Sequence, residues 1–259
     1  MLLKNKVTVI TGGAGGIGLS ASRIFADNGA TVVILDIVEE AGKKVEKELT
    51  DKGHKALFIR TDISNEEQVK AAAAEIDRVF GRVDVLYNNA SIFLGVGHER
   101  RDNKMTDLDS AIWDRVVRIN LYGMYHCTKH LIPLMRKAGA GSIINTSSSA
   151  GQIGIPECDA YTATKGAVTA LTRSLAVEYG PENIRTNCIA PAAILTEMVK
   201  ESNLNDPRFD EKKFLETGTP LRRWGLPEDI AHVALFLASD LSSYCNGTVI
   251  VADGGITVS

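Results

Sequence analysis

The stretch Lys6-Val7-Thr8-Val9-Ile10-Thr11, followed by Gly12-Gly13-Ala14-Gly15-Gly16-Ile17-Gly18, decides which fold we expect of this chain. Its β-branched first half predicts a strand, and apolar residues at helical spacing begin directly after the glycines. Glycines let the backbone turn sharply and approach a pyrophosphate, and a helix N-terminus offers free N–H groups to it. A strand before the turn and a helix after it are the context that a dinucleotide site requires. We therefore expect a cofactor-binding turn made by Gly12, Gly15, Gly16, Ile17 and Gly18.

The second predicted strand, 31–35, ends in Asp36, which stands 18 residues after Gly18. A carboxylate there can accept hydrogen bonds from both hydroxyls of an adenosine ribose, and it repels a 2′-phosphate. The glycine turn contains no Arg or Lys, and Ile37 rather than a base follows Asp36. These residues predict a preference for NAD over NADP. The alternative is that Asp36 only caps a helix beginning near Glu39.

Strands and helices alternate along the rest of the chain. Further strands are predicted at 55–60, 83–87, 141–146, 184–189 and 247–251, and a capping box from Ser64 to Glu67 predicts the start of one helix. This alternation is typical of right-handed βαβ crossovers and a parallel sheet. We expect one α/β domain over residues 1–259, a Rossmann-like doubly wound sheet of about seven strands flanked by helices. The mixed stretch 192–221 is predicted to be a substrate-binding flap.

Tyr161 and Lys165 open another apolar helical run. Residues four apart lie on one face of a helix, so the phenol and the ammonium can approach the same small volume. A cation within about 4–6 Å favours phenolate and lowers the phenol pKa from its usual value near 10. Such a pair can move a proton at neutral pH. The alternative is a solvated helix face that carries both residues without chemistry.

Five features together resemble the short-chain dehydrogenase/reductase family along almost the whole chain. They are Thr11-Gly12-x-x-x-Gly16-x-Gly18, Asn88-Asn89-Ala90, Tyr161-x-x-x-Lys165, Ser148 at 13 residues before Tyr161, and Asn120 in a predicted helix. The chain departs from the family pattern at Ser91, where Gly is usual, and at Ala192, where Gly usually follows the proline. Both departures leave the substrate in doubt more than the type of reaction.

The resemblance implies roles for four residues. Tyr161 is the general acid/base, and Lys165 lowers its pKa and holds the nicotinamide ribose. Ser148 hydrogen-bonds the substrate oxygen, with Ser147 and Ser149 as neighbours that sequence alone can confuse with it. Asn120 holds a water that links Lys165 to solvent.

The resemblance also implies cofactor contacts. Asp62 and Ile63 are expected to flank the adenine, Asn89 to approach the adenosine side, and Ile194 and Thr196 to contact the carboxamide or the phosphates. Each of these residues could instead be a loop cap.

The expected activity is NAD(H)-dependent interconversion of a secondary alcohol and a ketone by hydride transfer, with Tyr161 as acid/base. Segments around Phe93, Ile153 and Phe214 suggest a mostly apolar substrate. A polar insertion at 97–106 carries Arg100, Arg101 and Lys104, which either meet an acidic group or form a solvated loop. The alternatives are an NADP(H)-dependent ketone reductase and a non-catalytic nucleotide-binding protein, because fold does not imply function.

Composition excludes several classes of protein. A net charge of −3 over 259 residues offers no basic field for nucleic acid or anionic lipid. No apolar run reaches membrane-spanning length, and four scattered cysteines suggest reduced thiols, so a cytoplasmic location is expected. His126 and His130 stand four apart without an evident third ligand, and we expect no metal site. The resemblance implies a homotetramer formed through the two long helices, with apolar faces at 126–135 and 168–179, and through the C-terminal region.

Overall fold

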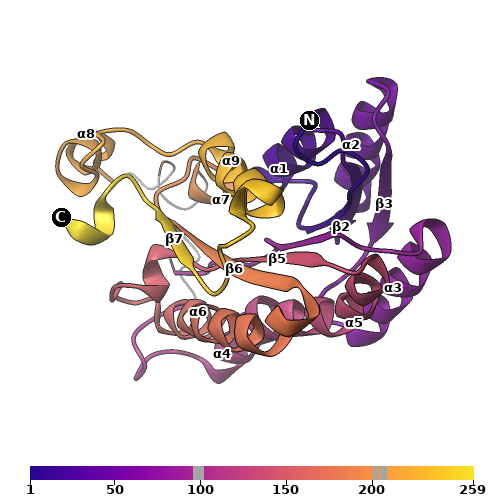
Figure 1. Cartoon of the computed structure of the whole chain (residues 1–259). Coiled ribbons are helices and arrows are strands. Elements are labelled where there is room, and N and C mark those ends of the chain that lie inside the picture. Colours follow the sequence, from indigo (N-terminus) through magenta and orange to yellow (C-terminus); the bar gives the residue numbers. More distant parts are fainter. Residues whose placement is uncertain (96–101, 201–203, 205–208) are drawn as a thin grey trace.

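A computed structural model describes residues 1–95, 102–200, 204 and 209–259 of the chain. Strands and helices alternate through most of it (Figure 1). The strands are β1 Val7–Thr11, β2 Thr31–Asp36, β3 Ala56–Arg60, β4 Val85–Asn88, β5 Gly141–Thr146, β6 Ile184–Pro191 and β7 Val249–Ala252. The longer helices are α1 Gly16–Asp27, α2 Glu39–Asp51, α3 Glu66–Phe80, α4 Ser110–Val117, α5 Gly123–Ala138, α6 Asp159–Tyr179 and α9 Pro227–Ala238. The short helices α7 Glu197–Val199 and α8 Glu211–Lys213 lie in the stretch predicted as a flap.

All seven strands pair in parallel in one sheet, in the order β3-β2-β1-β4-β5-β6-β7. The predicted Rossmann-like sheet is confirmed. Because β1 has β2 on one side and β4 on the other, the strand order reverses between β1 and β4. Doubly wound sheets bind ligands in the crevice outside the carboxyl ends of strands at such a switch point. The glycine turn after β1 and Asn89 after β4 both lie at this position.

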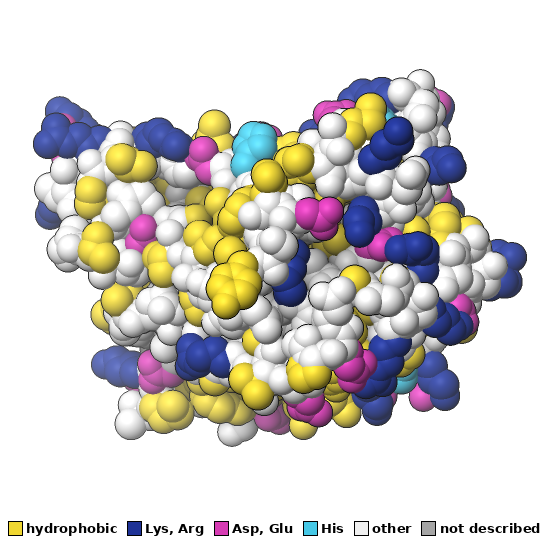
Figure 2. Space-filling model, viewed as in Figure 1, with side chains coloured by type: hydrophobic (Ala, Val, Ile, Leu, Met, Phe, Trp, Pro, Cys, Tyr) yellow, Lys and Arg dark blue, Asp and Glu magenta, His cyan; other side chains and the backbone are white. Residues whose placement is uncertain are grey.

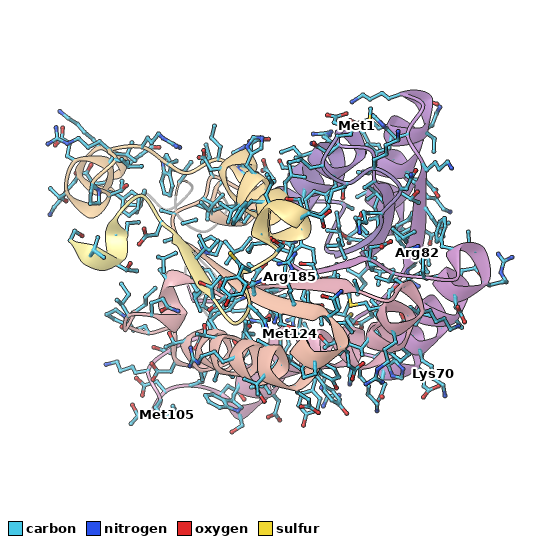
Figure 3. All side chains as sticks on the ribbon, viewed as in Figure 1. Met1, Lys70, Arg82, Met105, Met124 and Arg185 are labelled. Carbon is cyan, nitrogen blue, oxygen red and sulfur yellow. The ribbon has the colours of Figure 1, made fainter. Side chains whose placement is uncertain are left out.

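Helices cover both faces of the sheet. In Figure 1, α1, α2 and α9 lie above the sheet, and α3, α4, α5 and α6 lie below it. Successive strand residues point to opposite faces: Ile10 packs in the core with Phe25 of α1, whereas Val9 packs in the second core with Leu131 of α5. Figure 3 shows Met124 in the lower layer, where it packs with Val168 of α6. The central strands are buried on both faces and therefore fix the strand ends that carry the site.

One predicted helix start is wrong. The helix α3 is capped by Asn65, whose side-chain oxygen accepts hydrogen bonds from the amides of Glu67 and Gln68. The Ser64 hydroxyl instead donates to the carboxylate of Asp62 at 2.7 Å. Ser64 and Asn65 can both cap a helix. Because the Ser64 hydroxyl is bonded to the Asp62 carboxylate, Asn65 serves as the cap.

The surface mixes charged and apolar groups. Figure 2 shows hydrophobic side chains over the middle of this face and Lys and Arg mainly along its outer edges. Among the helices of the described part of the chain, none combines the length and the apolar character needed to cross a membrane.

Candidate active site

The glycine turn after β1 has a shape that requires glycine. Gly12 and Gly16 have φ of +64° and +49°, in the left-handed region that side chains disfavour. A Cβ on Gly18 would lie 2.1 Å from the carbonyl oxygen of Gly12, so no side chain fits there. Gly15, just before α1, and Ile17 in its first turn leave the helix N-terminus without a charged side chain. This N-terminus can hold an anionic pyrophosphate by its amides and dipole.

Asn89 and Asp36 brace the same turn. The Asn89 side-chain amide donates to the carbonyl oxygen of Thr11 at 3.1 Å, which ties the end of β4 to the start of the turn. The Asp36 carboxylate accepts the amide of Ala14 at 3.1 Å and the amide of Val38 at 3.0 Å. Asp36 therefore lies beside the glycine turn and is tied to it through Ala14. The residue that precedes α2 is Val38, so Asp36 is not its N-cap.

Tyr161, Ser148 and Lys165 come together at the carboxyl end of β5. The Ser148 hydroxyl lies beside the Tyr161 phenol and favours its ionised form. Lys165 lies one turn further along α6, 5.4 Å from the centroid of the Tyr161 ring, and its ammonium donates to the carbonyl oxygen of Thr146 at 2.9 Å. The Lys165 side chain is fully buried, although it is a cation. The three residues form a compact group at this end of the sheet.

The expected lowering of the Tyr161 pKa is wrong for this structure. Burial raises the pKa of Tyr161 to about 12, and the neighbouring Ser148 hydroxyl opposes that rise. Burial lowers the pKa of Lys165 to about 8. The sequence spacing showed that the two groups approach each other, but it could not show that both lose contact with water, which penalises their charged forms.

The three serines before α6 differ in their contacts. The Ser147 hydroxyl donates to the carbonyl oxygen of Lys165 at 2.8 Å and also bonds to Thr169 at 2.9 Å. Ser149 is buried at the start of a 3₁₀ turn, Ser149–Gly151. Of the three, Ser148 is the one whose hydroxyl meets the Tyr161 phenol.

Asn120 lies in a π-helical turn, Arg118–Tyr122, between α4 and α5. Its side-chain oxygen accepts the amide of Ile92 at 2.8 Å, and its side-chain amide donates to the carbonyl oxygen of Ile92 at 2.9 Å. It also donates to the Thr164 hydroxyl on α6 at 3.4 Å. Asn120 thus connects the segment after β4 to α6. Local π-helical geometry frequently accompanies functional sites, and it was not predicted from the sequence.

The remaining predicted cofactor contacts lie around the same edge of the sheet. Asp62 accepts from Ser64, and Ile63 is buried against Gly123 of α5. Thr196 is close to the turn, since a Cβ on Gly16 would lie 3.4 Å from its methyl group. Ile194 is buried, and its segment pairs with Gly225.

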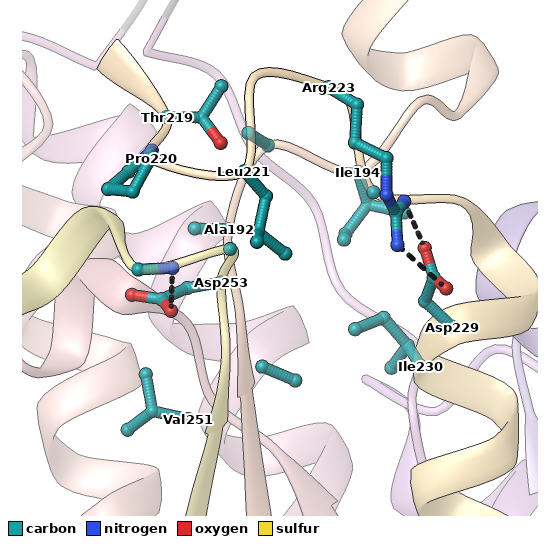
Figure 4. Close-up of a pocket in the computed structure, with 15 residues that line it drawn as sticks. Ala192, Ile194, Thr219, Pro220, Leu221, Arg223, Asp229, Ile230, Val251 and Asp253 are labelled. Carbon is teal, nitrogen blue, oxygen red and sulfur yellow. Dashed lines mark hydrogen bonds and ion pairs between the residues drawn. The ribbon is translucent and has the colours of Figure 1, made fainter. Parts of the chain in front are cut away.

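A cavity of about 500 Å³ lies beside Ile194, at the carboxyl ends of β6 and β7 (Figure 4). Its wall includes Ala192, Leu221, Ile230 and Val251, and its lining includes neither Ser148 nor Tyr161. The cavity was not predicted from the sequence. The ion pair between Arg223 and Asp229, at 2.7 Å, lies on one side of it.

Several predicted residues lie elsewhere or outside the described part. Arg100 and Arg101 of the insertion fall outside the described residues, and Lys104 is exposed. His130 lies 3.0 Å from the Glu66 carboxylate, which also pairs with Lys129. Among the residues that the structure describes, no three His, Cys, Asp or Glu side chains are placed to hold a metal ion. The positive φ near the family departure falls on Ala193, at +50°, rather than on Ala192.

Comparison with known proteins identifies the family to which this chain belongs. A family model described as "Enoyl-(Acyl carrier protein) reductase" matches residues 12–257, and curated relatives match over nearly the whole chain. The chain belongs to the short-chain dehydrogenase/reductase family.

Three similar proteins illustrate the range of this family. The chain is 40% identical to a 3-oxoacyl-[acyl-carrier-protein] reductase of Chlamydia muridarum, covering 98% of each chain. It is 38% identical to cis-4-hydroxycyclohexanecarboxylate dehydrogenase of Sinomonas cyclohexanicum, covering 97% of this chain and 96% of the other. The crystal structure of a gluconate 5-dehydrogenase from Burkholderia cenocepacia, in complex with NADP and tartrate, aligns with a TM-score of 0.91 at 32% identity, covering 99% of this chain and 97% of that one.

Membership in the short-chain dehydrogenase/reductase family makes this protein a hydride-transfer oxidoreductase that acts on CH–OH groups with a nicotinamide cofactor. Its glycine turn fits such a cofactor, because Gly12 and Gly16 allow the backbone to turn sharply and the backbone at Gly15 has no neighbouring atoms where a pyrophosphate must approach. The two curated relatives are named for different substrates, a 3-oxoacyl-[acyl-carrier-protein] in one and cis-4-hydroxycyclohexanecarboxylate in the other.

Proposed function

We propose that this short-chain dehydrogenase/reductase interconverts a secondary alcohol and a ketone, with NAD(H) as cofactor and Tyr161 as general acid/base. The observation that carries the proposal is the contact of the Tyr161 phenol with Ser148, one helical turn from the buried ammonium of Lys165. A non-catalytic nucleotide-binding protein would have no need to bury a lysine beside a tyrosine, because burying a cation is costly.

The preference for NAD rests on Asp36. Its carboxylate lies at the edge of the glycine turn, held by the amides of Ala14 and Val38. An adenosine 2′-phosphate placed there would meet a negative charge with no Arg or Lys from the turn to neutralise it. The alternative, an NADP(H)-dependent ketone reductase, is supported by the NADP in the related gluconate 5-dehydrogenase structure.

The cofactor site would use residues from four loops and from helix α6. The pyrophosphate would lie on the turn of Gly12, Gly15, Gly16, Ile17 and Gly18, with Asp62, Ile63 and Asn89 on the adenosine side and Ile194 and Thr196 on the nicotinamide side. Lys165 would hold the nicotinamide ribose. When bound, the nicotinamide supplies or accepts the hydride at the substrate carbon.

Proton transfer is the task of the chain's own residues. In reduction, Tyr161 donates its phenolic proton to the carbonyl oxygen, and in oxidation it accepts the alcohol proton. Ser148 donates a hydrogen bond to the same oxygen and stabilises the negative charge that develops there. Asn120 would hold the water through which Lys165 exchanges protons with solvent. With a pKa of about 12, Tyr161 is protonated at neutral pH, which suits reduction, and oxidation gains as pH rises.

Substrate class follows from the lining near Tyr161. The Phe93 ring packs against the Tyr161 ring with centroids 4.6 Å apart, so one wall of the reacting site is aromatic. We propose a mostly apolar secondary alcohol or ketone, with cyclic alcohols as the first class to test, because one relative is named for a hydroxycyclohexane substrate. The stretch 192–221 would cover the bound substrate.

The proposal extends to the domain organisation and to the oligomeric state of the protein. The whole chain, 1–259, would act as one catalytic domain, and α5 and α6 would pair with other copies in a homotetramer. These helices and the turn before α5 expose apolar side chains, among them Tyr122, Tyr125 and Val177. We further propose a cytoplasmic location.

The test is turnover of purified protein with a panel of aliphatic, cyclic, sugar-like and steroidal secondary alcohols, each with NAD and with NADP. NADH formation with a cyclic or apolar alcohol, faster at pH 9 than at pH 7, is the expected result. Tight cofactor binding without turnover of any alcohol, or of the matching ketones with reduced cofactor, would favour the non-catalytic alternative.

A further inference from the structure

Asp102 is a fully buried carboxylate in the described end of the polar insertion. Its Oδ1 accepts the amide of Ala160 at 3.1 Å and the amide of Asn103 at 2.9 Å. Its Oδ2 accepts the amide of Tyr161 at 2.8 Å. Both oxygens of one side chain are therefore engaged by backbone N–H groups, and two of these belong to the residues at and just before the proposed acid/base.

These contacts hold the first turn of α6. The helix begins at Asp159, so the amides of Ala160 and Tyr161 are among the first-turn N–H groups that have no acceptor within the helix. A carboxylate at this end also interacts favourably with the helix dipole. Hydrogen bonds from N–H groups to an ionised acceptor are stronger than those between neutral groups.

Asp102 also joins this turn to the segment after β4. Its own amide donates to the carbonyl oxygen of Leu94 at 2.9 Å. The preceding residue, Phe93, packs its ring against the Tyr161 ring with an angle of 55° between the planes. The backbone of Tyr161 and the aromatic neighbour of its side chain thus share one anchor. Figure 3 labels Met105, which follows this anchor at the lower left edge of the molecule, near α4 and α6.

Capping of the helix alone does not require a buried carboxyl group that accepts hydrogen bonds from two first-turn amides. A neutral serine or asparagine would cap one amide, and it would not bring an ionisable carboxyl into the interior at a desolvation cost. Asp102 instead gives each oxygen to a different amide of consecutive residues, which restrains both the position and the rotation of the turn.

We propose that Asp102 is a positioning residue for Tyr161, which fixes the first turn of α6 so that the phenol points at Ser148. The inference rests on the proposed function, because it presupposes that Tyr161 transfers the proton. Small displacements of a reacting group lower rates strongly, by up to about a hundredfold for 1 Å. Asp102, in the described end of the insertion, would then serve the reaction through its side chain.

The experiment compares Asp102→Ala and Asp102→Asn with the wild type and with Asp109→Ala. Asp109 is an exposed side chain that caps α4 through the amide of Ala111 at 2.8 Å, so its loss removes a comparable cap elsewhere. For each variant we would measure NADH affinity, kcat per cofactor-binding site, and the pH profile of alcohol oxidation. The groups facing the phenol are Ser148 from the end of β5, and Lys165 and Cys158 on and before α6.

We expect Asp102→Ala to lower kcat per site by about tenfold or more while NADH affinity stays within about twofold. Because Ser148 opposes the high pKa of Tyr161, loosening that contact should also move the oxidation profile to higher pH, which loss of stability alone would not do. Asp102→Asn keeps one acceptor and should give an intermediate kcat, and it decides the matter if the Ala variant does not fold.

Unchanged kcat and pH profile in Asp102→Asn and Asp102→Ala, or a loss no larger than in Asp109→Ala, would overturn the inference. A Tyr161→Phe variant measured beside them separates the two proposals. If Tyr161→Phe is inactive and Asp102→Ala is normal, only the positioning role fails. If Tyr161→Phe retains wild-type turnover, the proposed function itself fails.

Discussion

The Ser148 hydroxyl lies beside the phenol of Tyr161 and favours its ionised form, whereas the hydroxyl of the adjacent Ser147 donates to the backbone oxygen of Lys165 at 2.8 Å. Two neighbouring residues of the same type therefore face different partners. One meets the group proposed to transfer the proton, and the other fastens the helix that carries it. Their removal should have different consequences.

Replacing each serine with alanine separates chemistry from stability. Ser148→Ala should lower kcat by about 10²–10³-fold, the usual effect of losing one donor to a developing oxyanion, with little change in unfolding. Ser147→Ala leaves a buried carbonyl and the Thr169 hydroxyl without this partner and should cost about 1–3 kcal/mol of unfolding free energy. Steady-state kinetics and urea unfolding of both variants give the comparison. Equal kinetic losses in the two variants would contradict the assignment of Ser148.

Burial of Lys165 makes stability depend on pH in a defined window. Its pKa is about 8 in the folded chain and that of an unfolded lysine is about 10.4, so between these values the unfolded chain binds more protons. The free energy of unfolding of the wild type, relative to Lys165→Met, should therefore rise with pH from about 8 to 10, by about 2–3 kcal/mol. The raised pKa of Tyr161, about 12, acts above this window.

Urea unfolding of both proteins without added cofactor, at fixed protein concentration and at several pH values, tests this dependence. The Lys165→Met variant should be the more stable of the two near pH 7.5, because the wild type buries an ammonium there. Curves that run parallel from pH 7.5 to 10 would show that Lys165 keeps an ordinary pKa in the folded protein.

Asp36 should set the choice between cofactors. Asp36→Ala removes the repulsion of a 2′-phosphate and the acceptor for the ribose hydroxyls, so kcat/KM should fall with NADH and rise with NADPH. A change of at least about tenfold in the ratio, equivalent to about 1.4 kcal/mol, is expected. Asp62→Ala, at the end of the next strand, is the matched control, and its ratio should change less. An unchanged ratio in Asp36→Ala would remove the basis for the NAD preference.

The sheet was predictable because its signals are local. The run Val7–Thr11 and the glycines after it specify a strand, a turn and a helix within a few residues, and a positive φ at Gly12 is what such a turn demands. Tyr161 and Lys165 were placed on one helical face by spacing alone, and the structure brings them together.

The rest could not be predicted because it depends on contacts between distant segments. Asp102 meets Tyr161 across 59 positions, and within a polar insertion it looked like an ordinary solvated residue. The predicted direction of the Tyr161 pKa shift was wrong, because the spacing of residues along the sequence does not show that the phenol is buried. The N-cap of α3 was predicted at Ser64 and is Asn65 in the structure, because two adjacent residues can both cap the helix.

The most direct test of the account is the rate of hydride transfer in Tyr161→Phe, measured by stopped-flow NADH fluorescence with the best alcohol of the panel. Phenylalanine keeps the ring that packs against Phe93 and removes only the hydroxyl that Ser148 contacts. If Tyr161 transfers the proton, NADH binding should be unchanged and the rate should fall by about 10²–10⁴-fold at every pH, the usual share of general acid/base catalysis. A rate within about tenfold of the wild type would show that another group transfers the proton.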